Sequence, residues 1–130
     1  VCTKSIKSRI FNLTDAIAEK NLDKALKLLN DMLILKEPIP KILFMIARQL
    51  RNILEMKMLS MEGLNVNDAC AKMGITPYVG SKVLSQTKRF SVDKLKEGIR
   101  EASELDLAIK TGRINDRIAV ELLINKLANG

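Results

Sequence analysis

The longest helical stretch in the sequence is residues 38–61, PIPKILFMIARQLRNILEMKMLSM. Both prolines come at its start, where proline suits the first turn of a helix, and neither proline nor glycine follows. Apolar residues recur at helical spacing and cover most of the circumference: Ile39, Ile42, Leu43, Ile46, Leu50, Ile53, Leu54 and Met58, widened by Phe44, Met45 and Ala47. We therefore expect a central helix packed on more than one side.

Shorter helical patterns lie on both sides of this stretch. Each is bounded by residues that favour helix ends, namely polar caps, proline or glycine. On the N-terminal side, the predicted helices cover residues 14–20, capped by Thr14, and a segment from Asn21 or Leu22 to the break at Glu37-Pro38. On the C-terminal side, they cover residues 66–73 between Asn65 and Gly74, a segment from Thr76-Pro77 to about Phe90, and a segment from Ser91 to Thr111 before Gly112. The last predicted helix starts at Asn115 or Asp116, and its apolar stripe consists of Ile118, Ala119, Leu122, Leu123 and Leu127. No strand pattern competes, so the predicted fold is all-α, a single bundle of about six or seven helices with short connections.

The length and composition fit one domain. Hydrophobic residues make up 47% of the 130 and charged residues 28%, and no uncharged apolar run reaches the roughly 18 residues that a membrane-spanning helix needs. Residues 1–12 are interpreted as a linker or the tail of a preceding module, and residues 13–130 as the helical domain. Val1 is no start methionine and no signal-peptide pattern follows it, so we expect a fragment of a longer cytoplasmic protein.

The sequence offers little for catalysis. It has no histidine, which removes the commonest general base and metal ligand, and no complete phosphate-binding glycine loop. The two cysteines, Cys2 and Cys70, cannot complete a zinc site without histidine, so Cys70 is expected in the core. Ser91-Val92-Asp93-Lys94 and Lys110-Thr111-Gly112 match two β-lactamase motifs, but the third motif is missing and a helix cap and stop explain both. We expect no enzyme activity, no cofactor and no metal.

The net charge of +7 permits attraction to nucleic acid or to an acidic protein surface without choosing between them. A helix-turn-helix over residues 66–89 is the alternative interpretation, because its second helix is basic, with Lys82, Lys88 and Arg89 available for phosphates. Its phase is poor, since Gly80 falls where a buried side chain is expected. Its first exposed positions also lack Arg, Asn or Gln to contact base edges.

Several phrases in a fixed order resemble one family, the C-terminal domain of the delta subunit of bacterial DNA polymerase III, a part of the sliding-clamp loader. They are Phe11-x-Leu13-x-Asp15-Ala16-Ile17, Lys20-Asn21-x-x-Lys24-Ala25-Leu26-x-Leu28-Leu29, Pro38, Ile42-Leu43, Ile46-Ala47-Arg48-Gln49-Leu50-Arg51, Lys57, Gly74-Ile75-x-Pro77-Tyr78, Phe90-Ser91 and Asp106-x-x-Ile109-Lys110-Thr111-Gly112. The resemblance runs from about Phe11 to Leu127. Leu50 departs from it, because phenylalanine is common there in the family.

The resemblance implies a role in assembly. It implies a collar domain that joins equivalent domains of the delta-prime and gamma/tau subunits and so holds the clamp loader together. It further implies that the element that binds the sliding clamp and the AAA+-like modules both lie on the N-terminal side, to which residues 1–12 would lead. DNA would be contacted indirectly or weakly, and no membrane would be involved.

Two groups of candidate contact residues lie inside the shared phrases or directly after one of them. Arg48, Gln49 and Arg51 are the candidates for a subunit interface, because arginine forms bidentate contacts with carboxylates and two arginines do not suit a core. Lys110, Thr111 and Arg113 are the candidates for a contact with a partner or with DNA, although residues 110–112 also suit a plain helix end.

Overall fold

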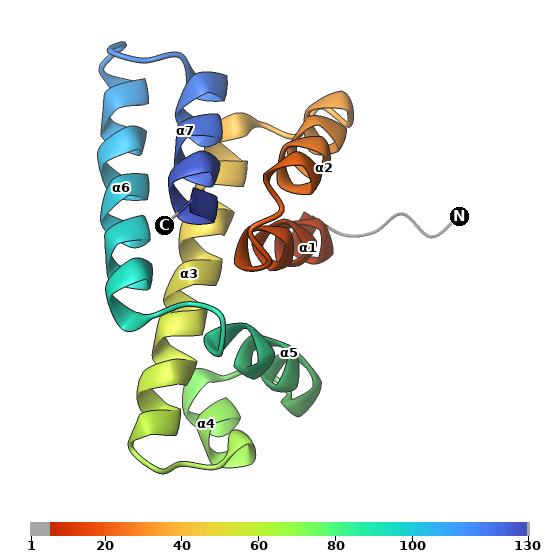
Figure 1. The fold of residues 1–130 in the computed structure, drawn as a ribbon, viewed down its shortest axis with the longest axis vertical. Coiled ribbons are helices and arrows are strands. Elements are labelled where there is room, and N and C mark those ends of the chain that lie inside the picture. Colours follow the sequence, from red (N-terminus) through yellow and green to blue (C-terminus); the bar gives the residue numbers. More distant parts are fainter. Residues whose placement is uncertain (1–5, 130) are drawn as a thin grey trace.

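The computed structural model describes residues 6–129, and this part of the chain contains seven α-helices and no strand (Figure 1). The helices are α1 (Ile6–Ala18), α2 (Leu22–Ile34), α3 (Ile39–Met61), α4 (Val66–Met73), α5 (Pro77–Thr87), α6 (Val92–Lys110) and α7 (Asp116–Asn129). The predicted all-α bundle is therefore confirmed. Cys2 and the first residues of the proposed linker lie outside the described residues.

Helix α3 is the centre of the bundle, as its sequence predicts. It runs along most of the height of the molecule, with α6 and α7 beside its first half and α4 and α5 against its second half (Figure 1). It also packs against α1, and α2 packs against α1 and α7. Its buried side chains are Ile42, Leu43, Ile46, Ala47, Leu50, Ile53 and Met56.

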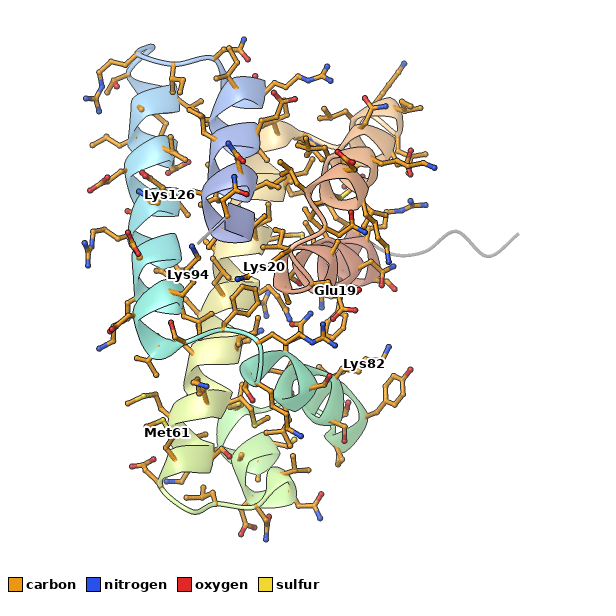
Figure 2. All side chains as sticks on the ribbon, in the orientation of Figure 1. Glu19, Lys20, Met61, Lys82, Lys94 and Lys126 are labelled. Atoms are coloured by element: carbon orange, nitrogen blue, oxygen red, sulfur yellow. The ribbon has the colours of Figure 1, made fainter. Side chains whose placement is uncertain are left out.

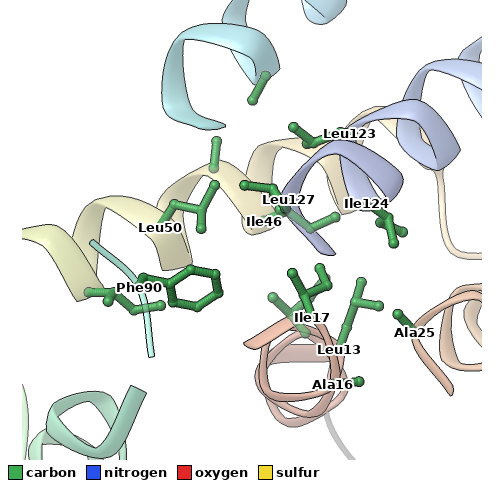
Figure 3. Packing of buried hydrophobic residues seen from close by; sticks show 14 of the residues in the cluster. Leu13, Ala16, Ile17, Ala25, Ile46, Leu50, Phe90, Leu123, Ile124 and Leu127 are labelled. Atoms are coloured by element: carbon green, nitrogen blue, oxygen red, sulfur yellow. The ribbon is translucent and has the colours of Figure 1, made fainter. Parts of the chain in front are cut away.

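The main core lies where α1, α3 and α7 meet, with α2 closing one side (Figure 3). Leu13 and Ile17 of α1 point toward α7, on the side where Ile124 lies, and all three are at most 1% exposed. Each fully buried side chain of this size contributes about 1.5–3 kcal/mol of hydrophobic free energy. Apolar packing therefore holds the N-terminal helix α1 against the C-terminal helix α7.

Local polar contacts fix where four of the helices begin. The side chains of Asn21, Asn65, Thr76 and Ser91 each accept a hydrogen bond from the backbone N–H three residues later, across 2.8–3.3 Å. These bonds satisfy N–H groups that have no partner within the helix. The four predicted starts are confirmed.

The first predicted helix start is wrong. Helix α1 begins at Ile6, and Thr14 lies inside it, fully buried, with its hydroxyl 3.0 Å from the Ile10 carbonyl oxygen and 2.9 Å from that of Phe11. A buried threonine that bonds back to the preceding turn is compatible with a helix interior. Residues 6–12 are thus helical. Whether they continue a preceding module stays a prediction.

Four side chains that the sequence predicts on the apolar faces of their helices are exposed instead. Phe44 and Met58 of α3 are 60% and 44% exposed, and Ile118 and Leu122 of α7 are about half exposed. Helix α7 instead buries a stripe centred on Val120, Ile124 and Leu127 together with Ala119 and Leu123. Helix α5 ends at Thr87, three residues before the predicted end, although Phe90 is buried as a core residue.

Candidate interaction surfaces

One exposed stripe runs along the outside of α3. Phe44, Arg48, Arg51, Glu55 and Met58 follow one another at steps of four and three residues, which places them on one face, and all five are exposed. Neither arginine forms an ion pair or a side-chain hydrogen bond with any residue of the described chain, 6–129. Both guanidinium groups are therefore available to carboxylates of another molecule. We call these five residues the α3 stripe.

Gln49 lies beside the α3 stripe but points into the protein. Its Nε2 donates to the Oε1 of Gln86 on α5 across 2.9 Å, and the Nε2 of Gln86 donates to the Thr14 hydroxyl (3.3 Å) and, across 3.4 Å, to the Phe11 carbonyl oxygen. Gln86 is 1% exposed. Gln49 therefore takes part in a hydrogen-bond network that joins α3, α5 and α1. Its side chain points away from Arg48 and Arg51, with which it was grouped as an interface candidate.

The second predicted group, Lys110, Thr111 and Arg113, lies at the turn between α6 and α7. Lys110 pairs with Asp106 at 2.8 Å, the Thr111 hydroxyl donates to the Leu107 carbonyl oxygen at 2.9 Å, and Arg113 Nε donates to the Thr111 hydroxyl oxygen at 3.1 Å. The backbone N–H of Arg113 donates to the Ala108 carbonyl oxygen, which with Gly112 in the left-handed region (φ 74°) makes a Schellman helix end. Local structure accounts for all three residues.

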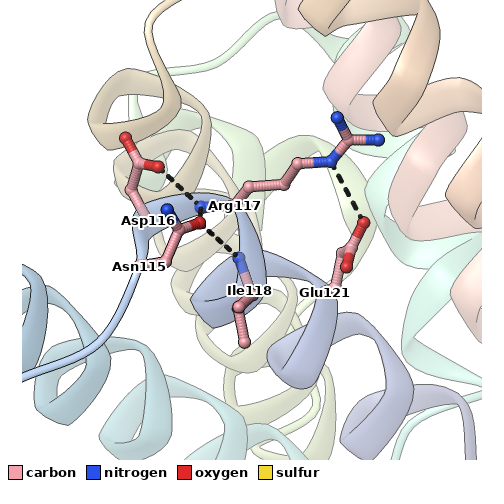
Figure 4. A network of polar contacts seen from close by, with 5 residues as sticks. All are labelled: Asn115, Asp116, Arg117, Ile118 and Glu121. Carbon is pink, nitrogen blue, oxygen red and sulfur yellow. Dashed lines mark hydrogen bonds and ion pairs between the residues drawn. The ribbon is translucent and has the colours of Figure 1, made fainter.

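The start of α7 completes this turn (Figure 4). The side chain of Asn115 accepts hydrogen bonds from the backbone N–H groups of Arg117 (3.0 Å) and Ile118 (3.3 Å), and Asp116 accepts one from Arg117 N–H at 2.7 Å. Arg117 Nε lies 3.3 Å from Glu121 Oε2. Lys110 and Arg117 thus each have a carboxylate partner. Arg113, the third cation at this turn, has none among residues 6–129.

A groove of about 700 Å³ separates α6 from α7. Lys94 and Lys126 lie along it (Figure 2) and are both used within the protein, since Lys94 Nζ donates to the Lys126 carbonyl oxygen at 2.9 Å and Lys126 Nζ lies 3.2 Å from Glu101. The described residues contain no group of three or more side chains that could hold a metal ion.

The α4–α5 corner is a tight helix pair. Gly80 is buried, and a Cβ on this residue would lie 2.0 Å from the Sγ of Cys70, so only glycine allows α5 to approach α4 this closely. Cys70 is buried, as the sequence predicts. The first exposed side chains of α5 are Pro77, Tyr78, Val79 and Ser81, which do not include an Arg, Asn or Gln that would contact base edges. This geometry does not favour a sequence-specific helix-turn-helix.

Two surface features escaped the sequence analysis. Phe44 was assigned to the core because its neighbours are apolar, and no signal in the sequence marks its side as exposed. The second feature is a cation–π pair in which Lys82 Nζ lies 4.6 Å from the centre of the Tyr78 ring. Its spacing of four residues on a predicted helix is a signal that could have revealed it.

Within residues 6–129, no helix is both long and apolar enough to cross a membrane. The structure is a bundle of α-helices, and it therefore belongs to the class of all-α domains.

Comparisons with known proteins narrow this class. The family model for the DNA polymerase III delta subunit, C-terminal domain, matches residues 7–127, so the chain belongs to that family. DNA polymerase III subunit delta of Bacillus subtilis is 25% identical over 124 residues, which are 95% of this chain and 36% of that protein. The solved structure of the Bacillus subtilis DNA clamp loader delta protein superposes with a TM-score of 0.94 and 24% identity, over all of this chain and 38% of that one. The chain therefore spans little more than a third of the length of these relatives.

Proposed function

We propose that this chain is the domain through which a delta subunit is held in the collar of a clamp loader, in contact with the delta-prime and gamma/tau subunits. The proposal rests on the family and on one observation of the structure, the α3 stripe. There, Phe44 is 60% exposed and is followed along the same face by Arg48 and Arg51, which have no carboxylate partners among residues 6–129. Arginine and aromatic side chains are the types most enriched where protein interfaces gain their binding energy.

The partner surface that fits the α3 stripe is apolar at the position of Phe44 and carries carboxylates opposite Arg48 and Arg51. The proposed role needs no reaction on this domain, no cofactor and no metal. The same proposal has the chain act in the cytoplasm, with the sliding clamp bound by other parts of the delta subunit.

The proposed assembly role has a direct test. The chain is mixed at micromolar concentration with the collar domains of delta-prime and gamma/tau, and the complex is measured by analytical ultracentrifugation. We expect the wild-type chain to enter a complex and the double variant Arg48→Glu, Arg51→Glu to lose it, because charge reversal juxtaposes like charges.

A charge-matched control is Lys27→Glu, Lys96→Glu, which changes two exposed cations outside the α3 stripe. Circular dichroism spectra of all variants establish that the fold is intact. Absence of a complex with the wild-type chain would contradict the assembly role. Loss of the complex in the control variant but not in the α3-stripe variant would contradict the choice of surface.

A further inference from the structure

The exposed face of α3 is longer than the α3 stripe. Lys41 precedes the stripe by three residues and Glu62 follows it by four, and both are exposed. The steps along this face, which we call the long α3 face, alternate between three and four residues, the repeat of a helix face that packs along a second helix. Its members in chain order are Lys41, Phe44, Arg48, Arg51, Glu55, Met58 and Glu62.

The charges of the long α3 face are separated along the helix. Its three cations come first and its two carboxylates last, with one apolar side chain inside each part. Neither Glu55 nor Glu62 forms an ion pair with residues 6–129, and the pair between Lys41 and Glu37 is long, at 3.9 Å. The charges of this face are therefore available to another molecule.

A face with this order of charges complements its own reverse. In a symmetric pair of antiparallel α3 helices, with the two-fold axis close to Arg51, each residue of one copy lies level with a residue of the other. Lys41 then lies level with Glu62 of the second copy, and Arg48 with Glu55 of the second copy. The two-fold axis repeats each contact, so the pair contains four ion pairs between opposite charges.

The apolar side chains meet in the same arrangement. Phe44 lies within one residue of the height of Met58 of the second copy, which allows a contact between the sulfur and the ring. Only Arg51 meets its own kind, and Glu55 of the second copy lies about 4.5 Å further along, within reach of the guanidinium group. A parallel pair would instead place every charge beside its own kind, which is unfavourable.

We propose that α3 packs against α3 of a second copy of this chain, antiparallel about a two-fold axis near Arg51, and that this dimer covers the α3 stripe until partner subunits replace it. The second part rests on the proposed function, which assigns the same stripe to those subunits. The apolar contact is limited to two side chains from each copy. The dimer should therefore be weak and dissociate in the micromolar range.

Sedimentation equilibrium of the chain alone, from about 1 to about 200 μM, tests the pairing. We expect an equilibrium between monomer and dimer. Arg48→Glu and Glu55→Arg should each weaken dimerisation at least about tenfold, since each places like charges against one another in two pairs. The double variant exchanges the two charges and should dimerise to within about threefold of the wild-type chain. Lys27→Glu, which changes an exposed lysine of α2, is the charge-matched control and should dimerise as the wild-type chain does.

Disulfide cross-linking in a Cys2→Ser background tests the direction of the pair. Arg51→Cys should give a linked dimer on oxidation with copper phenanthroline, because the two copies of this residue lie beside the axis. Phe44→Cys is the matched control, since its two copies would lie about 22 Å apart along the helices. The remaining cysteine, Cys70, is buried.

The residues substituted in α3 are all exposed, so the variants should keep the wild-type circular dichroism spectrum. Three results would overturn the pairing. They are a wild-type chain that stays monomeric at about 200 μM, a double variant that dimerises no better than the single variants, and a cross-link in Phe44→Cys as efficient as that in Arg51→Cys.

Addition of the delta-prime and gamma/tau collar domains to the dimer separates this inference from the proposed function. We expect complexes that contain one copy of the chain, formed at the expense of the dimer. A complex with two copies would overturn the mutual exclusion. A complex formed by a chain that does not dimerise would contradict only this inference, whereas a dimer without any complex would contradict the proposed function and leave the pairing in place.

Discussion

Gln49 of α3 and Gln86 of α5 are joined by a 2.9 Å hydrogen bond that directs Gln49 away from the surface on which its arginine neighbours lie. The bond continues to Thr14 of α1, so three helices far apart in sequence share one polar network. Gln86 and Thr14 are at most 1% exposed, and in such surroundings a polar atom without a partner costs about 1–3 kcal/mol. The network therefore specifies how α5 and α1 meet on α3.

This network predicts opposite effects for two neighbouring residues. Gln49→Ala should lower the free energy of unfolding by about 1–2 kcal/mol, since it removes a hydrogen-bond partner of a buried amide. It should leave subunit association unchanged at temperatures where the variant is folded. Arg48→Ala should leave the free energy of unfolding nearly unchanged and should weaken subunit association. Urea denaturation and ultracentrifugation measure the two effects, and wild-type stability of Gln49→Ala would contradict the structural role of Gln49.

The contact between Gly80 and Cys70 predicts a rescue by a second substitution. Gly80→Ala puts a Cβ 2.0 Å from the Cys70 sulfur, and overpacking of this kind costs about 1–3 kcal/mol. Cys70→Ala together with Gly80→Ala should recover much of this loss, because the next nearest atoms, Met56 Cε and Cys70 Cβ, lie at 3.6 and 3.7 Å, which is ordinary contact. The midpoint of thermal unfolding reports both variants. A double variant less stable than Gly80→Ala would contradict the explanation.

Two lysines occupy backbone positions that favour glycine. Lys20 and Lys36 have φ angles of 60° and 62°, and each follows a helix whose end is closed by a Schellman pair of hydrogen bonds. A side chain in this region costs about 1–2 kcal/mol, although glycine also loses more backbone freedom on folding and the lysine charge favours a helix carboxyl end. Lys36→Gly should therefore stabilise the protein by less than about 1 kcal/mol.

The control for this backbone effect is Lys27→Gly, an exposed lysine inside α2. It should destabilise the protein by about 1 kcal/mol, since glycine is a poor helix former. Urea denaturation of both variants measures the difference. The backbone explanation would be contradicted if both substitutions stabilised the protein or if both destabilised it.

The sequence was sufficient to predict the helices wherever local chemistry sets their ends. Asn65 and Gly74, for instance, bound α4 at the predicted residues. It failed at α1 because Lys7 and Arg9 interrupt the apolar series, in which Ile10, Leu13 and Ile17 are the buried members. In the structure Lys7 is exposed and Arg9 is half-buried, and the helical period becomes visible only once the buried residues are known.

The choice of buried face could not be predicted where a helix is apolar on several sides. In α7 the run Val120, Leu122, Leu123 and Ile124 fits more than one stripe, and the contacts with α1, α2, α3 and α6 decide that Leu122 is the exposed member. The candidate sites depend on contacts between distant residues in the same way. Gln86 is 37 residues from Gln49, so sequence spacing could not separate Gln49 from Arg48 and Arg51.

Two adjacent residues of α3 provide a last prediction, since Leu43 is 1% exposed and Phe44 is 60% exposed. Leu43→Ala should cost about 2–5 kcal/mol, because it leaves a cavity in the core. Phe44→Ala should change stability by at most about 0.5 kcal/mol, as expected for surface substitutions, and should weaken association with the partner subunits. Denaturation and ultracentrifugation of both variants measure this contrast. A large loss of stability in Phe44→Ala would mean that the ring supports the bundle, and the α3 stripe would then lose its apolar anchor.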